Sequence, residues 1–260
     1  MTITNDMKKQ NVKKLVTYLI ALAVFTFIGY GIPAMLKVNF LDVTRSAYIP
    51  LYLVGCAAPT LAAAVLGKEE RETMRAELKH SGIKRYFVAA PVLLFVHFAL
   101  HGIRGYAYTL SFKEYWLTYI TLFVGGLLSE LGFMTVLRPI LETRSGYSKG
   151  LLALGLVRSL WYVPIVYMPG TPINAFQFIY FCIGVVGANY LGYVVYSTTE
   201  CIRLTSLFHA FLIPLSLCFM AKQDYFLAIF AIVEFIVARI LYVGVQEKKK
   251  EERQQERFRS

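Results

Sequence analysis

The sequence predicts an all-α fold, a polytopic membrane protein of about eight transmembrane helices with both termini in the cytoplasm. Composition is the first observation behind this prediction. Of the 260 residues, 57% are hydrophobic and 17% are charged, and the mean hydropathy is +0.54. A soluble domain has about 45–50% apolar and about 25% charged residues. The second observation is that the charges cluster between long apolar runs, each long enough to cross a bilayer.

Eight apolar runs qualify as transmembrane helices. Their approximate limits are 15–36, 47–67, 86–104, 115–137, 150–168, 173–196, 204–220 and 223–245. If the N-terminus is cytoplasmic, 20 of the 27 Lys and Arg residues lie in inner segments and 5 lie in outer ones. This asymmetry favours an N-in, C-in topology. It also accounts for the net charge of +11 by topology and attraction to anionic lipid, so no nucleic-acid partner is expected.

The segments around the first two runs support this organisation. The run 15–36 follows Lys13 and Lys14 and is too long for the apolar region of a cleaved signal peptide, so we interpret it as a signal anchor. The segment 68–84 mixes apolar residues with many charges, which indicates a short interfacial helix. The chain is therefore expected to form one membrane domain, 1–245, followed by a charged cytoplasmic tail, 246–260, either helical or disordered.

Several apolar runs contain ionisable residues, which are costly in hydrocarbon and are functional-site candidates by default. They are Glu130, Arg158, His209, Glu234 and Arg239, with His97 and His101 in the third run. Glu130 and His209 lie at similar depth in the cytoplasmic half, within about 5 Å of each other along the membrane normal. Arg158 is placed to neutralise either Glu130 or Glu234. We predict that Glu130 and His209 form a structural polar tie with Arg158.

The remaining ionisable residues have simpler interpretations. Glu234 and Arg239 are expected to fix helix packing, with Arg239 reaching toward the inner surface. His97 and His101 are one helical turn apart, which would suit two metal ligands, but packing histidines are the simpler reading. The four cysteines show no paired spacing and are read as apolar residues, which gives no sign of a metal or redox site.

Three short segments together form a recognisable pattern. The segment 129–141 reads SELGFMTVLRPIL, the segment 160–164 reads LWYVP, and the segment 209–213 reads HAFLI. In order and spacing they resemble the motifs of the CPBP family, the Abi or CAAX-protease-like membrane proteins. Those motifs run roughly E-E-x-x-x-R, LWHLP and H-x-x-x-N/D. The resemblance covers about residues 120–216.

The resemblance implies a degraded site. Proteolytic members of the family use two glutamates and two histidines to activate water, and an Asn helps to stabilise the oxyanion. The matching positions here are Ser129, Glu130, Met134, Tyr162, His209 and Ile213. Glu130 and His209 alone keep the family's polar residue. A catalytic zinc usually takes three protein ligands, and losing one oxyanion donor already costs about 10²–10³ in rate, so no catalytic residue and no metal are expected.

The resemblance therefore implies a catalytically inactive protein that acts as a scaffold or regulator, similar to bacterial Abi-domain regulators of the SpdC type. Its partner would be a cell-envelope hydrolase or a membrane sensor, gripped through a transmembrane helix, and its location a bacterial plasma membrane. One alternative is an active intramembrane peptidase with a rearranged site on Glu130, His209 and either Tyr162 or the third-run histidines, with zinc as its cofactor. A bacteriocin immunity protein is a further alternative, and a transporter is disfavoured because internal repeats are missing.

Overall fold

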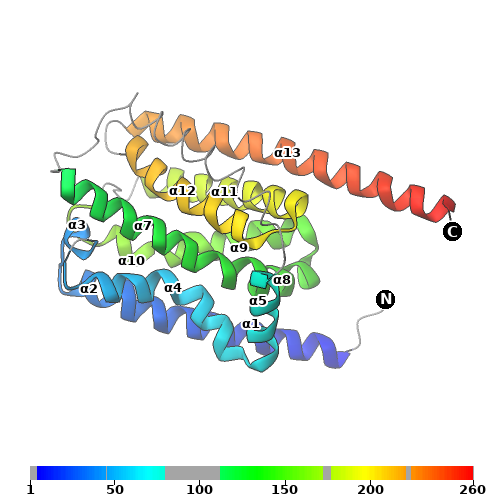
Figure 1. Ribbon diagram of the computed structural model, residues 1–260, viewed down its shortest axis with the longest axis horizontal. Coiled ribbons are helices and arrows are strands. Elements are labelled where there is room, and N and C mark those ends of the chain that lie inside the picture. The colour runs from blue at the N-terminus through cyan, green and yellow to red at the C-terminus, as the bar shows by residue number, and fades with distance from the viewer. Residues whose placement is uncertain (1–4, 45, 80–111, 172–176, 221–223, 260) are drawn as a thin grey trace.

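The computed structural model of the chain describes residues 5–44, 46–79, 112–171, 177–220 and 224–259. Within these ranges every regular element is a helix and there is no β-strand, which confirms the all-α class. The long helices lie side by side along one axis of an elongated bundle (Figure 1). In chain order the elements are α1 (Asn5–Thr26), η1 (Phe27–Gly31), α2 (Ile32–Met35), α3 (Phe40–Val43), α4 (Ile49–Leu66), α5 (Lys68–Lys79), α7 (Phe112–Gly132), η2 (Phe133–Leu137), α8 (Arg138–Ser145), α9 (Tyr147–Trp161), α10 (Val163–Val166), α11 (Gln177–Thr199), α12 (Ile202–Met220) and α13 (Asp224–Arg259).

Among the described residues, five helical stretches are long and apolar enough to cross a membrane. They are Lys9–Met35, Ile49–Leu66, Ile120–Ser145, Tyr147–Val166 and Gln177–Thr199. These stretches correspond to the first, second, fourth, fifth and sixth predicted runs. The seventh and eighth runs fall in α12 and α13. The third run, with His97 and His101, lies outside the described residues.

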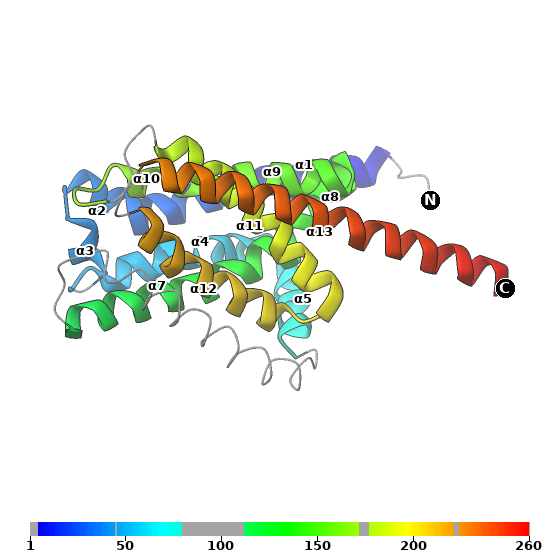
Figure 2. The same cartoon turned by 90° about the horizontal axis from the view of Figure 1, so that it is seen from above.

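The two described ends of the chain lie at the same end of the bundle, together with α5 and α8 (Figure 1). We call this the α5 end. The short helices α2, α3 and α10 lie at the opposite end (Figures 1 and 2). The helix α5 turns away from the long axis of the bundle, as Figure 2 also shows. Its range, Lys68–Lys79, falls within the segment 68–84 in which a short interfacial helix was predicted.

In the described residues, two π-helical turns interrupt the long helices, and each ends two residues before a proline. These turns are η1 and η2, followed by Pro33 and Pro139. A proline inside an α-helix lacks its N–H, and its ring collides with the carbonyl four residues earlier. The wider π turn relieves this conflict. As a result α7, η2 and α8 form one continuous helical rod, which runs past residue 137, the approximate limit of the fourth predicted run.

The helix α4 crosses its neighbours closely enough to require glycine. A Cβ atom on Gly29 would lie 2.0 Å from the backbone nitrogen of Gly55, and one on Gly132 would lie 2.1 Å from the carbonyl oxygen of Pro59. At the second crossing the Thr60 hydroxyl accepts a hydrogen bond from the Gly132 N–H at 3.1 Å. Small residues allow such close backbone approach in membrane proteins. This crossing fixes the part of α7 that carries Glu130.

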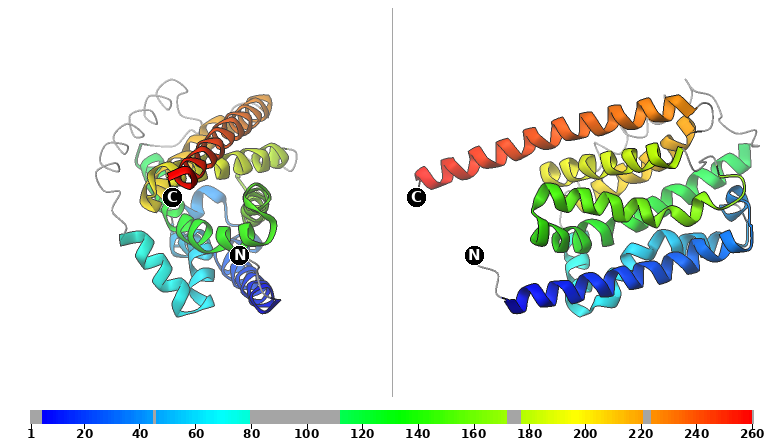
Figure 3. Two further views of the ribbon diagram at one scale, coloured as in Figure 1. Left: turned by 90° about the vertical axis from the view of Figure 1, so that its right-hand side faces the viewer. Right: turned by 180° about the vertical axis from the view of Figure 1, so that it is seen from behind.

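The last helix, α13, runs without a break from Asp224 to Arg259 and extends beyond the rest of the bundle (Figures 1 and 3). The predicted tail, 246–260, is thus a continuation of this helix as far as Arg259. The first part of α13 packs against α11 and exposes a row of apolar side chains, as expected of a surface that faces lipid. These are Ile229, Ile232, Val233, Ile236, Val237, Ile240, Leu241 and Val243.

Candidate functional site

Three polar side chains from three helices meet inside the bundle. Glu130 of α7, Arg158 of α9 and His209 of α12 are 1%, 1% and 6% exposed. Nη1 of Arg158 donates a hydrogen bond to Oε1 of Glu130, and the same nitrogen lies 3.1 Å from Nδ1 of His209. Nδ1 of His209 lies 3.4 Å from the same carboxylate oxygen. One guanidinium nitrogen therefore joins α7, α9 and α12.

The contact geometry favours a neutral imidazole in this cluster. A guanidinium group only donates hydrogen bonds, so a ring nitrogen of His209 that bonds to Arg158 accepts, and Nδ1 is the nearer one, at 3.1 Å against 3.4 Å for Nε2. The ring hydrogen is then placed on Nε2. The cluster thus contains one carboxylate and one guanidinium, and their charges cancel. Pairing of this kind is what allows ionised groups to remain buried.

One aromatic ring lies against the guanidinium group, and a second ring packs on the first. The central carbon of the guanidinium group lies 4.6 Å from the ring centroid of Phe133, which gives a cation–π contact. The Trp161 ring meets Phe133 edge-on at 5.4 Å, and its Nε1 donates to the carbonyl of Gly55 at 3.1 Å. Within the described part of the chain, Nε and Nη2 of Arg158 make no hydrogen bond. The cation therefore depends on Glu130 and His209 for its polar contacts.

The first family motif contributes one residue to the cluster. The hydroxyl of Ser129 is fully buried and donates to the carbonyl of Gly126, in its own helix, at 3.1 Å. Met134, at the position of the motif arginine, is 1% exposed and belongs to the apolar core. Glu130 thus has its cation supplied by Arg158, from another helix. The sequence predicted this pairing, and the structure brings the two residues together.

The other two motif positions do not add polar groups to the cluster. The ring of Tyr162 packs against Trp161, at 4.5 Å between centroids, and against Phe181, at 5.2 Å. No hydrogen bond from Tyr162 to the cluster is found among the described residues. Ile213 lies in α12 one turn after His209, and its side chain is outside the described residues. The cluster is therefore made of Glu130, Arg158 and His209.

The two ionisable residues of α13 stay apart from this cluster. Arg239 donates to the Ser148 hydroxyl at 3.1 Å and lies 4.9 Å from the ring centroid of Tyr190. It thus reaches the α8–α9 connection at the α5 end. Glu234 faces α11, since a Cβ atom on Gly184 would lie 3.4 Å from its Oε2. Glu234 has no hydrogen bond or ion pair with any other residue that the structure describes.

The donor set does not fit a catalytic zinc ion. In the described ranges no three His, Cys, Asp or Glu residues are grouped so that they could hold a metal. Glu130 and His209 supply two ligands, and a catalytic zinc usually takes three. Both are also in contact with Arg158, whose positive charge opposes a metal cation at that place. The pair His97 and His101 lies outside the described residues.

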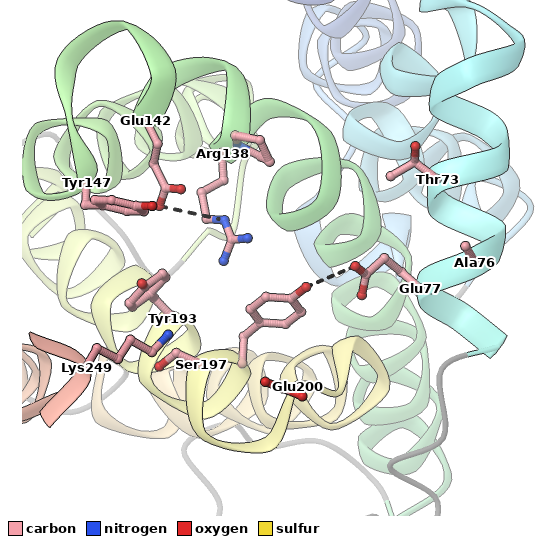
Figure 4. A pocket seen from close by; sticks show the side chains of 12 residues that line it. Thr73, Ala76, Glu77, Arg138, Glu142, Tyr147, Tyr193, Ser197, Glu200 and Lys249 are labelled. Carbon is pink, nitrogen blue, oxygen red and sulfur yellow. Dashed lines mark hydrogen bonds and ion pairs between the residues drawn. The ribbon is translucent and has the colours of Figure 1, made fainter. Parts of the chain in front are cut away.

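A second polar site, which the sequence analysis missed, lies at the α5 end. A pocket of about 670 Å³ is lined by residues of α5, α8, α9, α11 and α13 (Figure 4). Sequence reasoning treated the basic residues of this region as topology signals. The sequence did contain a relevant pattern, because Tyr193 and Tyr196 lie three residues apart on α11. Their rings contact the guanidinium group of Arg138, the residue that follows η2. The lining of the pocket includes the charged and aromatic residues Glu77, Arg138, Glu142, Tyr193, Tyr196 and Lys249.

Comparisons with known proteins give no assignment for either site. The chain matches no family model, and no curated protein is significantly similar to it. The resemblance to the CPBP family therefore stays a prediction that rests on three short segments.

Proposed function

We propose that this protein is a non-catalytic membrane protein of the CPBP type, which acts as a scaffold or regulator of a cell-envelope hydrolase or a membrane sensor. The observation that carries the proposal is the position of Arg158 between Glu130 and His209. A general base must be free to take a proton from water within hydrogen-bond reach. Here the carboxylate and the imidazole both contact a buried guanidinium group. The cluster is suited to hold helices together and poorly suited to hydrolyse a peptide.

The proposal includes an eight-span topology with both termini in the cytoplasm of a bacterium. It is supported by the charge asymmetry of the sequence and by the position of both described chain ends at the α5 end (Figure 1). The charged helix α5 and the basic residues of α8 lie at the same end, which would face the cytoplasm. The bacterial plasma membrane follows from the family resemblance.

A partner helix is proposed to pack on α13. This helix exposes an apolar surface along its first part, and Glu234 has no polar partner among the described residues. An ionisable group inside a membrane normally finds a donor or a counter-charge. A neighbouring transmembrane helix with a basic or hydroxyl residue would supply one. This would give the partner both an apolar surface and one specific polar contact.

The absence of catalysis can be tested on the purified full chain. We expect no cleavage of prenylated or transmembrane peptides, with or without added zinc. Turnover that disappears in both Glu130→Ala and His209→Ala, and persists in Ser129→Ala, would overturn the proposal in favour of a peptidase. The Ser129→Ala variant is the matched control, because its hydroxyl bonds to its own helix backbone.

The scaffold role can be tested by photo-cross-linking in the native membrane. A photo-reactive residue at Ile236 of α13, which is 50% exposed, should cross-link to one membrane protein. The control position is Leu156 of α9, which is 52% exposed and should give lipid adducts alone. Glu234→Leu should weaken the protein cross-link at Ile236. Equal protein labelling at both positions, or none at Ile236, would contradict a partner on α13.

A further inference from the structure

The pocket at the α5 end contains a buried cation with unused hydrogen-bond donors. Arg138 is 9% exposed, and its guanidinium group lies 4.6 Å from the ring centroid of Tyr196 and 5.4 Å from that of Tyr193. These rings hold the group in place by cation–π contact. Within the described residues, its Nε and Nη1 make no hydrogen bond. Figure 4 shows the guanidinium group pointing into the pocket.

Other donors face the same space. Nζ of Lys249 lies 5.7 Å from the centroid of the Tyr193 ring, so two cations flank one aromatic ring. The Tyr193 hydroxyl accepts a hydrogen bond from Nε2 of Gln246 at 3.1 Å, which leaves its own hydrogen available for another acceptor. Arg138, Lys249 and Tyr193 thus offer donors that suit the oxygens of a phosphate group.

The pocket also carries acceptors, so a simple anion would not satisfy it. Oε1 of Glu142 lies 3.8 Å from Nε of Arg138, which is an ion-pair distance but too long for a hydrogen bond. This oxygen is buried and makes no hydrogen bond in the described part of the chain. On the α5 side, Glu77 accepts a hydrogen bond from the Tyr196 hydroxyl at 3.0 Å. A ligand with a positive group beside its phosphate would use both signs of charge.

We infer that this pocket binds a phosphate ester that carries a primary amine, the chemistry of phosphoethanolamine. The phosphate oxygens accept from Arg138, Tyr193 and Lys249, and the ammonium group donates to Glu142. The volume of about 670 Å³ accommodates such a group, since small-molecule pockets run from about 300 to about 1,000 Å³. The source is either the headgroup of a phospholipid or a soluble compound, because the pocket lies at a bundle end where the amphipathic α5 forms one wall.

The inference can be tested by calorimetric titration of the full chain in a non-ionic detergent. Phosphoethanolamine should bind, and glycerol 3-phosphate, which lacks the amine, should bind at least about tenfold more weakly. Arg138→Gln and Lys249→Gln should each weaken phosphoethanolamine binding by about tenfold or more. Arg144→Gln is the matched control, because Arg144 is exposed on the same helix, α8, and does not line the pocket. Glu142→Gln should weaken phosphoethanolamine binding and should not weaken glycerol 3-phosphate binding, because it removes a negative charge beside Arg138.

Two further measurements complete the test. Thermal unfolding of each variant shows whether it is folded. Lys249→Gln keeps the test valid if Arg138→Gln does not fold, because Lys249 is half-buried whereas Arg138 is buried. Native mass spectrometry distinguishes the sources: phosphatidylethanolamine retained by the wild type and lost in Lys249→Gln indicates a lipid, and binding of free phosphoethanolamine without lipid retention indicates a soluble ligand. Equal binding of phosphoethanolamine and glycerol 3-phosphate, or no binding of either together with no retained lipid, would overturn the inference.

Discussion

Arg158 is the residue on which the buried polar cluster depends. Its Nη1 contacts both Glu130 and His209, and in the described part of the chain its other two guanidinium nitrogens have no hydrogen-bond partner. Loss of Glu130 would therefore leave a buried cation with one neutral contact. Removing one member of a buried ion pair is far more destabilising than removing both, because the survivor keeps its desolvation penalty.

We predict that Glu130→Gln lowers the free energy of unfolding by about 3–5 kcal/mol. The double change Glu130→Leu with Arg158→Met should lower it by less than the single change, because no charge is left behind. Unfolding in sodium dodecyl sulfate, followed by circular dichroism, measures both. Ser129→Ala serves as the control, with an expected loss of about 1 kcal/mol or less. A double variant less stable than Glu130→Gln would show that the pair itself supplies net stability.

At the scale of elements, the crossing of α4 and α7 positions the cluster. Gly132 lies two residues after Glu130, and its Cα faces the backbone of α4 without room for a side chain. The Thr60 hydroxyl accepts from the Gly132 N–H and donates to the carbonyl of Leu128 at 2.5 Å. The segment of α7 that carries Glu130 is therefore held against α4 by hydrogen bonds to its backbone as well as by close packing.

We expect Gly132→Ala to destabilise the protein by about 1–3 kcal/mol, the usual effect of overpacking, because α7 must move away from α4. Gly244→Ala is the control, since nothing lies within 4 Å of a Cβ atom there. A regular helix position should tolerate or prefer alanine. The midpoint of thermal unfolding reports both variants. Equal midpoints for Gly132→Ala and the wild type would show that the two helices separate easily at this crossing.

The sequence predicted the elements better than their continuity. Five of the predicted runs coincide with helices that can cross a membrane, because length and hydropathy alone decide such segments. The rod through η2 continues past residue 137, the approximate limit of the fourth apolar run, because hydropathy marks where an apolar segment stops and not where its helix stops. The tie among Glu130, His209 and Arg158 was predicted from the matching depth of Glu130 and His209 and from the positive charge of Arg158. The pocket could not be predicted, because its residues come from five helices whose side-by-side arrangement is a tertiary property.

For the whole molecule, the two ends of the bundle differ in chemistry. The α5 end holds both described chain ends, the charged helix α5, and Arg239 bonded to Ser148. At the opposite end, the N–H of Phe40 donates to the carbonyl of Pro169 at 2.7 Å, which ties α3 to the turn after α10. Topology reporters fused at each end can therefore show which end of the bundle faces the cytoplasm.

We predict that topology reporters fused at Lys79, Arg144 and the C-terminus read cytoplasmic and that one at Gly170 reads external. The reason is the concentration of Lys and Arg in the segments on the α5 side. Alkaline phosphatase and green fluorescent protein fusions, compared for each site, provide the measurement. A cytoplasmic reading at Gly170 would refute the eight-span, N-in and C-in arrangement.

The turn η2 also bears on how the chain tolerates insertions and deletions. Each π turn holds one residue more than an α turn, so removing one residue from Phe133–Leu137 would leave the flanking helices in phase. Glu130 and Arg138, on either side, would keep facing their present neighbours. Elsewhere a one-residue deletion rotates everything after it by about 100°. Deleting Val136 together with Pro139→Ala should thus give a folded protein, whereas deleting Leu154 from α9 should not, and chromatography in detergent would distinguish the two.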